Sequence, residues 1–554
     1  MAILARIERR YRLPAGHFKA LLPHAARATA GHRLKGVSSA ERRRLAWHLP
    51  DDFGSRTPSE RAEILEWIGK NILAGATDYR RYQTDARKHR YAVKFPTLGG
   101  RSTGRNSDAN DTVDRSLTDT LEAPPSLCAE MERLIEFKTA ALTNLGFRRN
   151  GVWCEETSSQ RIEHFGLMFG ALSAPPDGPV DGLGLPLHKV TFALLIFPAI
   201  WDWYLNWRER RRGFFTNWEV DMLRLGLSLA RSETGWLRQS PDLAHSLRVI
   251  DPFVAEEDIA AAHGDWSGLC DRFCGYAVSR AREVARVARI HRDPFEPILP
   301  VLEADSPLGE YRKITEEILR RMPDSRRYPL SAAEATRSFL MLRLGLHLGL
   351  RQKNLRELLL CKPGESPRSD RELERLRRGE IRWSERLGGW EVLIPCLAFK
   401  NAGSSFFANR PFRLMLPNLG LLYEHLDAWV RLHRKLLLKN APDPGTLFVK
   451  TVKTSSRDAS YNRNTFYDAW RLVIQRYGIW NPYTQRGAIP GLLPHGRHCV
   501  RDVLATHVLK QTGSYEQASY AIQDTPKMVA KHYGRFLPQD KASLAAKILN
   551  RAWD

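Results

Sequence analysis

The chain has 554 residues, of which 43% are hydrophobic and 10% aromatic, a composition that excludes a disordered protein and predicts two to four domains. Its 85 basic residues outnumber 62 acidic ones, and the net charge of +23 attracts phosphate backbones and repels acidic surfaces. Most of the basic residues are Arg, whose planar fork suits phosphate, although a GC-rich genome would produce the same bias. The composition therefore favours a nucleic-acid-binding protein.

Cysteine spacing and hydropathy narrow the class further. Cys270 and Cys274 lie one helical turn apart, but no second pair completes a zinc site. The N-terminus lacks the apolar segment of a signal peptide. The strongest apolar run, 190–201, is about half of the ~20 residues that a membrane-spanning helix needs. We expect a soluble cytoplasmic protein with buried, reduced thiols.

The chain divides where its composition changes. Residues 1–98 form a basic region with helical spacing of apolar residues over 59–73. Residues 99–125 are polar, which is typical of a linker or a long exposed loop. Residues 126–300 are again helical. Within them 201–215 interleaves aromatic residues with four arginines, which fits either a nucleic-acid-binding surface or the edge of a Trp-rich core with a solvated charged face.

Residues 305–554 are helical apart from three short runs with strand-like alternation, 379–383, 389–399 and 410–417. Turn-like segments join these runs, so they predict a small antiparallel sheet at one edge of a helical domain. Lys400 follows the second run directly, at the start of the loop to the third. On its own, a lysine in such a loop is an exposed charge.

The stretch 495–507 holds three histidines and two arginines in thirteen residues. His498 and Arg501 stand three apart at the start of a helix with apolar patterning, a spacing that chance also produces in so basic a chain. Arg351 closes an apolar helix, and Tyr533 lies near a helix end; each has an ordinary structural explanation. Their order along the chain, together with their local context, is more specific than any one of them.

This order resembles the catalytic domain of the tyrosine recombinase (phage integrase) family over residues 305–554. The resemblance implies a mainly α multidomain protein: helical N-terminal and core-binding regions, the latter at about 200–300, and an α+β catalytic domain. The matching motifs are Gly349-Leu350-Arg351, the hairpin lysine Lys400, His498 and Arg501 followed by Ala505-Thr506, and Tyr533 after Ile522-Gln523-Asp524.

The resemblance also implies a mechanism. A phenol with a pKa of ~10 is a poor nucleophile at neutral pH, and clustered cations would lower that pKa. Arg351 and Arg501 would grip the non-bridging oxygens of a DNA phosphate, with His498 as a hydrogen-bond donor. Lys400 would protonate the departing 5′ oxygen. Tyr533 would form a 3′-phosphotyrosyl intermediate, and no metal or nucleotide cofactor is needed.

The family's function would be site-specific recombination or integration of a mobile genetic element. The expected partners are double-stranded DNA, further copies of the chain in a tetramer on DNA, and accessory proteins, at the bacterial nucleoid. Two alternatives stay open: a recombinase-derived DNA-binding or target-selecting protein that no longer cuts, and a type IB-like topoisomerase. The segment 538–553 has helical periodicity and would pack on a neighbouring subunit or fold back on its own domain.

The sequence departs from the family at three positions. Asp524 stands where His or Trp commonly assists the phosphate, and a carboxylate there repels phosphate unless it is protonated or paired. Either Asp524 is turned away from the phosphate or another residue assists it, and Lys527 and His532 are the local candidates. Asn354 replaces a common acidic residue, but its amide carbonyl could still orient a guanidinium. Asp502 occupies a position where a basic residue is frequent.

Tyr533 has a rival nucleophile in Tyr520. On a helix over 515–523, Tyr515 shares a stripe with Ala518 and Ile522 at spacings of three and four, which indicates core packing. Tyr533 instead follows a Thr-Pro break, on a short new helix with cationic neighbours. A developing phenolate needs such a setting, so we predict that Tyr533 is the nucleophile.

Overall fold

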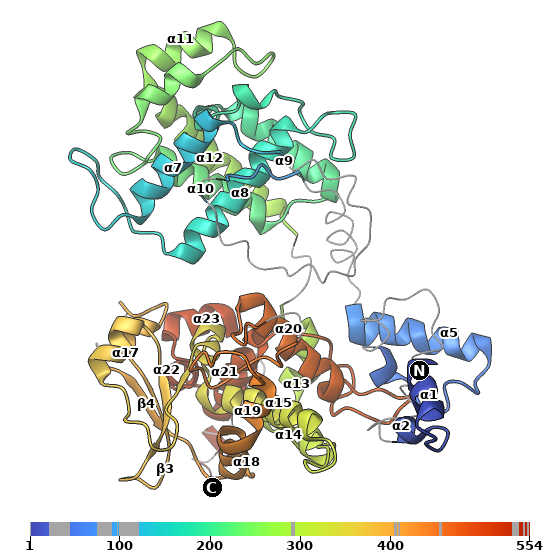
Figure 1. Cartoon of the computed structure of the whole chain (residues 1–554). Helices are drawn as coiled ribbons and strands as arrows, with labels where there is room; N and C mark the ends of the chain where they lie inside the picture. The colour runs from blue at the N-terminus through green and yellow to red at the C-terminus, as the bar shows by residue number, and fades with distance from the viewer. Residues whose placement is uncertain are drawn as a thin grey trace. The chain divides into compact units, whose positions relative to one another are not determined.

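The computed structural model describes residues 2–20, 45–74, 91–96, 98, 121–289, 294–403, 407, 410–453, 457–533 and seven positions near the C-terminus (542, 543, 545, 546, 549, 550 and 553). These residues are mainly helical with one small sheet, which confirms the predicted fold class (Figure 1). No helix among them is both long and apolar enough to span a lipid bilayer. Most of the predicted linker 99–125 and most of the tail 538–553 lie outside the described residues.

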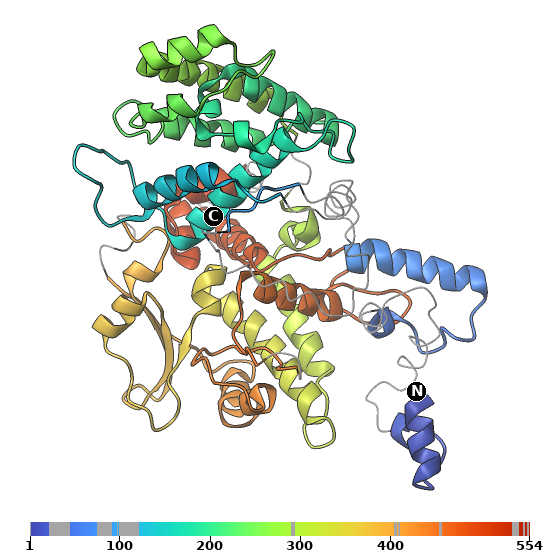
Figure 2. The same cartoon turned by 45° about the horizontal axis from the view of Figure 1, so that its top comes forward.

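The chain forms two compact units, one of residues 77–293 and one of residues 1–76 together with 294–554. The first of these is a helical unit (Figure 2). It has an aromatic core, in which the ring of Phe192 contacts those of Phe165, Phe169 and Trp236. Its α-helices are α7 (Pro125–Thr139), α8 (Glu155–Ser173), α9 (Pro198–Arg212), α10 (Asn217–Ala230), α11 (Glu256–Gly264) and α12 (Trp266–Val287).

Most of the stretch 201–215 lies in helix α9, which shows whether its aromatic residues form a nucleic-acid-binding surface or the edge of a Trp-rich core. Trp201, Tyr204 and Trp207 are buried in the core. Arg208 is buried as well, and its Nε lies 2.8 Å from Oε1 of Glu219 on α10. The aromatic residues therefore form the edge of a Trp-rich core, and Arg208 is already neutralised inside the protein.

The other unit is built around α15, which is buried on nearly all sides (Figure 1). Its apolar residues fill the helix all round, as expected of a central core helix. The α-helices of this unit are α1 (Ala2–Arg10), α2 (His17–Ala20), α5 (Pro58–Trp67), α13 (Leu299–Glu303), α14 (Pro307–Arg320), α15 (Pro329–Leu348), α16 (Gln352–Arg356), α17 (Asp370–Leu376), α18 (Leu422–Ala428), α19 (Arg434–Leu438), α20 (Arg463–Val473), α21 (His498–Thr512), α22 (Tyr515–Ile522) and α23 (Pro526–Tyr533).

The sheet has four strands in the order β1-β2-β3-β4 and lies at one edge of this unit in both views (Figure 1, Figure 2). The three predicted runs appear as β2 (Glu380–Ser384), β3 (Gly389–Ile394) and β4 (Phe412–Met415), paired antiparallel. A short strand β1 (Leu359–Leu360) adds a parallel pair with β2. The predicted antiparallel sheet is therefore wrong in one respect: the sheet is mixed.

Residues 45–74 belong to the unit that contains the sheet and pack into its core. The helix expected over 59–73 is present as α5, which begins at a Thr57–Glu60 capping box and continues as a π-helix over Ile68–Ala74. Ile64, Ile68 and Ile72 are buried in the same core as the C-terminal helices. The amide of Gln475 donates to the Ile72 carbonyl over 2.7 Å, an association that the sequence did not predict.

Candidate active site

Two arginines from distant parts of the chain meet at a single carboxylate oxygen. Arg351 immediately precedes α16, and Arg501 lies in the first turn of α21. Nη2 of Arg351 lies 2.6 Å from Oδ2 of Asp524, and Nη2 of Arg501 lies 2.9 Å from the same atom. We call the two guanidiniums the arginine cradle. Their geometry is that of charge-assisted hydrogen bonds converging on one anionic oxygen.

Backbone carbonyls hold Arg501 in place. Its Nη1 donates to the carbonyl of Gly349 over 2.8 Å and also to that of Ile522. The side chain is 2% exposed. Gly349 ends α15 in the left-handed conformation, with φ of 57°, which brings its carbonyl under the guanidinium. The orientation of Arg501 is therefore fixed by the ends of α15 and α22 as well as by Asp524.

The second arginine is more open and is oriented by a side-chain amide. Arg351 keeps 24% of its side-chain surface exposed, and its Nη1 donates to Oδ1 of Asn401 over 2.9 Å. The Asn401 amide in turn donates to the Gln523 carbonyl over 3.3 Å. Lys400, the preceding residue, is exposed in the segment between β3 and β4 where the sequence predicted it. Sequence reasoning missed Asn401, although it stands next to the predicted lysine.

His498 is the first residue of α21, three positions before Arg501, and its side chain is exposed. Desolvation and the charges of Arg501, Arg497 and Arg351 lower the pKa of the imidazole to about 4. At pH 7 the ring is neutral, so one ring nitrogen donates a hydrogen bond and the other accepts one.

Tyr533 ends α23 and is buried, at 5% exposure. Burial and the negative charge of Asp502 raise the pKa of the phenol to about 12, against the opposing effect of Arg501. The prediction of a lowered pKa is therefore wrong for the DNA-free protein. The rival Tyr520 is 60% exposed, while Ala518 of the predicted core stripe is fully buried.

The three departures from the family pattern have structural outcomes. Asp524 is not turned away, because it pairs with both arginines of the cradle. Asn354 is buried and donates to the Ala398 carbonyl over 3.0 Å, so the amide that contacts the first arginine is that of Asn401. Burial raises the pKa of Asp502 to about 7 despite the adjacent Arg501.

A second buried cation lies beside the cradle. Arg497 is 3% exposed, and its Nε, Nη1 and Nη2 have no hydrogen-bond partner among the described residues. Burial and the charge of Arg501 lower its pKa to about 9. Its guanidinium lies 6.0 Å from the Trp470 ring centroid. The positive charge of Arg497 acts on both Arg501 and His498.

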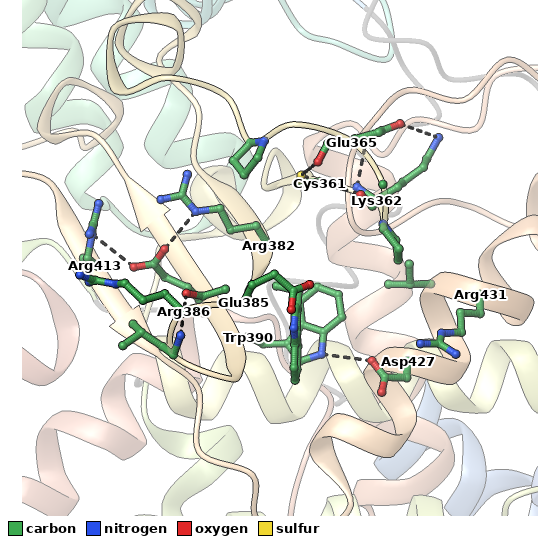
Figure 3. Close-up of a pocket in the computed structure, with 18 residues that line it drawn as sticks. Cys361, Lys362, Glu365, Arg382, Glu385, Arg386, Trp390, Arg413, Asp427 and Arg431 are labelled. Atoms are coloured by element: carbon green, nitrogen blue, oxygen red, sulfur yellow. Dashed lines mark hydrogen bonds and ion pairs between the residues drawn. The ribbon is translucent and has the colours of Figure 1, made fainter.

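A pocket beside the sheet includes neither arginine of the cradle among its lining residues. It has a volume of about 760 Å³ and opens at the turn end of β2 and β3 (Figure 3). Its charges largely neutralise one another: Arg382 and Arg413 both pair with Glu391, and the Trp390 indole donates to Asp427 over 3.3 Å. None of the five predicted site residues lines it.

Neither the thiols nor the carboxylates of the described residues build a metal centre. No group of three or more His, Cys, Asp or Glu side chains in these ranges could hold an ion. All seven cysteines are free thiols. Cys270 is buried, as predicted, and burial raises its pKa to about 12, whereas Cys154 is exposed.

No protein-family model matches the sequence, and no curated protein matches it. Solved structures that match include the XerH site-specific recombinase bound to palindromic difH substrate in a post-cleavage complex, with 13% identity, 60% of this chain and 85% of that chain covered, and a TM-score of 0.28. The same recombinase bound to difH substrate in a pre-cleavage complex matches with 11% identity over 76% and 96% of the chains, at a TM-score of 0.31. At these TM-scores the likeness decides neither fold nor function.

Proposed function

We propose that this protein cuts and rejoins double-stranded DNA through a phosphotyrosyl intermediate at Tyr533, as a site-specific recombinase. The observation that carries the proposal is the arginine cradle beside a tyrosine. Arg351 and Arg501 converge on one anionic oxygen, and Arg501 is the cation that favours the Tyr533 phenolate. Paired guanidinium forks stabilise the charge that develops on a phosphate under attack.

The proposed cleavage exchanges one ester for another. Oη of Tyr533 attacks the scissile phosphorus, and the bond from phosphorus to the 5′ oxygen breaks as the new bond forms. Arg351 and Arg501 hold the non-bridging oxygens, and His498 donates a hydrogen bond to one of them. Lys400 gives its proton to the departing 5′ oxygen. Attack by a 5′ hydroxyl reverses the step and rejoins the strand, so the reaction conserves bond energy.

The phenol proton needs an acceptor because the pKa of Tyr533 is about 12. Asp502 is a buried carboxyl group whose charge acts directly on Tyr533, and its pKa is about 7. A general base works best with a pKa near the working pH. We therefore propose that Asp502, which is 5% exposed on α21 next to Arg501, takes the phenol proton.

The net charge of +23 supports duplex DNA as the substrate. Helix α12, within the proposed core-binding region at about 200–300, carries exposed arginines at 272, 282 and 286. Each phosphate contact releases a counterion, so the logarithm of affinity should fall with the logarithm of salt with a slope of several units. Replacing the three arginines by alanine should make this slope shallower. A nearly flat salt response of the unaltered protein would contradict DNA as the partner.

The decisive experiment uses nicked duplexes taken from the DNA that flanks the gene. A nick just 3′ of the cleavage site lets the short fragment that carries the new 5′ hydroxyl diffuse away and traps the covalent adduct, which is seen as a denaturant-resistant shift of the protein band. The unaltered protein and Tyr520→Phe should form the adduct, and Tyr533→Phe should not. An adduct that persists in Tyr533→Phe would place the nucleophile elsewhere.

One observation favours a protein that binds DNA without cutting it: Asp524 fills the cradle with a carboxylate. Such a target-selecting protein would bind the same duplexes with the same salt dependence and give no adduct in any variant. An adduct that forms without transfer to a second duplex would instead favour a topoisomerase. The mass of the same trapped complexes gives the number of protein copies that assemble on the DNA.

A further inference from the structure

The carboxylate of Asp524 occupies the place that the proposed reaction requires for a phosphate oxygen. Its Oδ2 accepts hydrogen bonds from both arginines of the cradle, at 2.6 Å and 2.9 Å. Its Oδ1 accepts the Thr525 amide over 3.1 Å. The side chain is 11% exposed. One carboxylate oxygen with two guanidinium donors reproduces the contacts of a non-bridging phosphate oxygen.

A rigid turn delivers this carboxylate. Gln523 adopts the left-handed conformation with φ of 47°, and its side-chain amide nitrogen, Nε2, donates to the Leu348 carbonyl over 2.9 Å. The Asp524 amide donates to the Ser519 carbonyl over 3.0 Å. Gly349 allows the end of α15 to approach the same turn, because a Cβ there would lie 2.0 Å from the Ala521 carbonyl oxygen. The position of Asp524 is thus set by the fold.

Charge makes the two occupants of the cradle mutually exclusive. Arg501 is 2% exposed, and a buried cation without an anion is strongly disfavoured. In the DNA-free protein the anion is Asp524. A phosphodiester that approached both guanidiniums would meet a carboxylate already bound to them, and like charges at contact distance repel.

We propose that Asp524 is a resident anion that closes the cradle until the scissile phosphate displaces it. Binding of DNA at the cradle is then an exchange of carboxylate for phosphodiester, and Asp524 restrains cleavage on DNA that cannot drive the exchange. The effect on cleavage rests on the proposed function. The exchange of anions does not, since it needs only the two arginines and a phosphate.

The exchange is measured by titrating inorganic phosphate into the full-length protein by calorimetry at constant ionic strength. Asp524→Asn keeps the shape of the side chain and removes its charge. Asp458→Asn is the matched control, because Asp458 pairs with Lys450 over 2.9 Å at a 62% exposed position and its loss changes the net charge equally.

Phosphate should bind Asp524→Asn at least ~10-fold more tightly than either the unaltered protein or the control, because a cradle closed for ~90% of the time lowers apparent affinity tenfold. The gain should vanish when Arg351→Ala is added. Equal or weaker phosphate affinity in folded Asp524→Asn would overturn the proposal.

The covalent adduct on nicked DNA gives the second measurement. Asp524→Asn should form it faster than the unaltered protein, and a slower rate would count against restraint by Asp524. If no variant forms an adduct while phosphate binding still tightens, the exchange stands and the proposed cleavage fails. Should Asp524→Asn not fold, a structure of the unaltered protein on DNA decides: the proposal requires the carboxylate to have left both arginines, and a carboxylate still on them refutes it.

Discussion

Gly349→Ala tests whether the close approach of α15 to the turn after α22 builds the site. Gly349 has φ of 57°, and an added Cβ would lie 2.0 Å from the Ala521 carbonyl oxygen. A non-glycine residue in the left-handed conformation costs roughly 1–2 kcal/mol, and an overpacked contact costs about 1–3 kcal/mol. The substitution should therefore destabilise this unit by about 2–5 kcal/mol.

Gly388→Ala separates the two costs. Gly388 has φ of 60° in the turn between β2 and β3 of the same unit, and nothing lies within 4 Å of its ideal Cβ. Gly388→Ala should therefore lower the free energy of unfolding only by the conformational cost, about 1–2 kcal/mol. The free energy of unfolding of this unit is measured by hydrogen exchange of its peptides across a urea series, which distinguishes it from the other unit.

The expected difference between the two variants is about 1–3 kcal/mol. The displaced turn carries the Ile522 carbonyl that holds Arg501, as well as Asp524. Gly349→Ala should therefore also lose adduct formation on nicked DNA, while Gly388→Ala keeps it. Equal destabilisation of the two variants, or full adduct formation by Gly349→Ala, would refute this account of how the cradle is positioned.

Three further outcomes are expected. Tyr533→Phe should abolish the adduct and leave DNA affinity within about twofold in a gel-shift titration, since one hydroxyl is lost. Asn401→Ala should lower the single-turnover rate of adduct formation by about tenfold, because Arg351 loses its orienting amide. Asp502→Asn should flatten the pH dependence of stability. The native pKa of Asp502 is raised to about 7, so between about pH 4 and pH 7 the folded state keeps a proton that the unfolded chain has lost. The stability of the unaltered protein should therefore fall as the pH rises through that window. Urea unfolding of the unaltered protein and of Asp502→Asn at pH 5 and pH 8 measures this; equal pH dependence would contradict it.

The strands were predictable because their signal is local. Alternating apolar residues and turn residues around β2, β3 and β4 fix the hairpins without knowledge of the rest of the chain. Strand β1 was missed because a two-residue strand has no periodicity of its own. It forms because the segment after α16 lies beside β2, with Leu359 opposite Glu380, which is a tertiary event.

The candidate site was predictable by residue type and order, but not by contact. Nothing in the sequence near Asp524 announces that it pairs with Arg351 and Arg501, since the three lie in segments more than twenty residues apart. That pairing depends on the left-handed turn at Gln523 and on the glycine that lets α15 approach it. From its charge alone, Asp524 was expected to repel phosphate. In the folded protein it pairs with Arg351 and Arg501.

The phenol pKa fails as a sequence prediction for a related reason. Lys531 and His532 immediately precede Tyr533 in sequence but are exposed, while the tyrosine ring is buried. Burial and Asp502 therefore outweigh the cations, and the pKa of Tyr533 rises to about 12. Local charge counts describe a helix end in water, whereas desolvation depends on which face of α23 packs on the core.

The raised pKa constrains the order of events in the proposed cleavage. Replacing the Asp524 carboxylate by a phosphodiester exchanges one anion for another, so DNA binding alone does not turn the Tyr533 phenol into a phenolate. The proton must leave as the nucleophile attacks, and Asp502, with a pKa near 7 and its charge already acting on Tyr533, is the buried carboxyl group suited to take it. Cleavage should therefore accelerate as pH rises through about 7, and Asp502→Asn should remove that rise while leaving phosphate exchange at the cradle intact. A rise that survives in Asp502→Asn would assign the proton to another group, and His498, already neutral at that pH, would be the next to test.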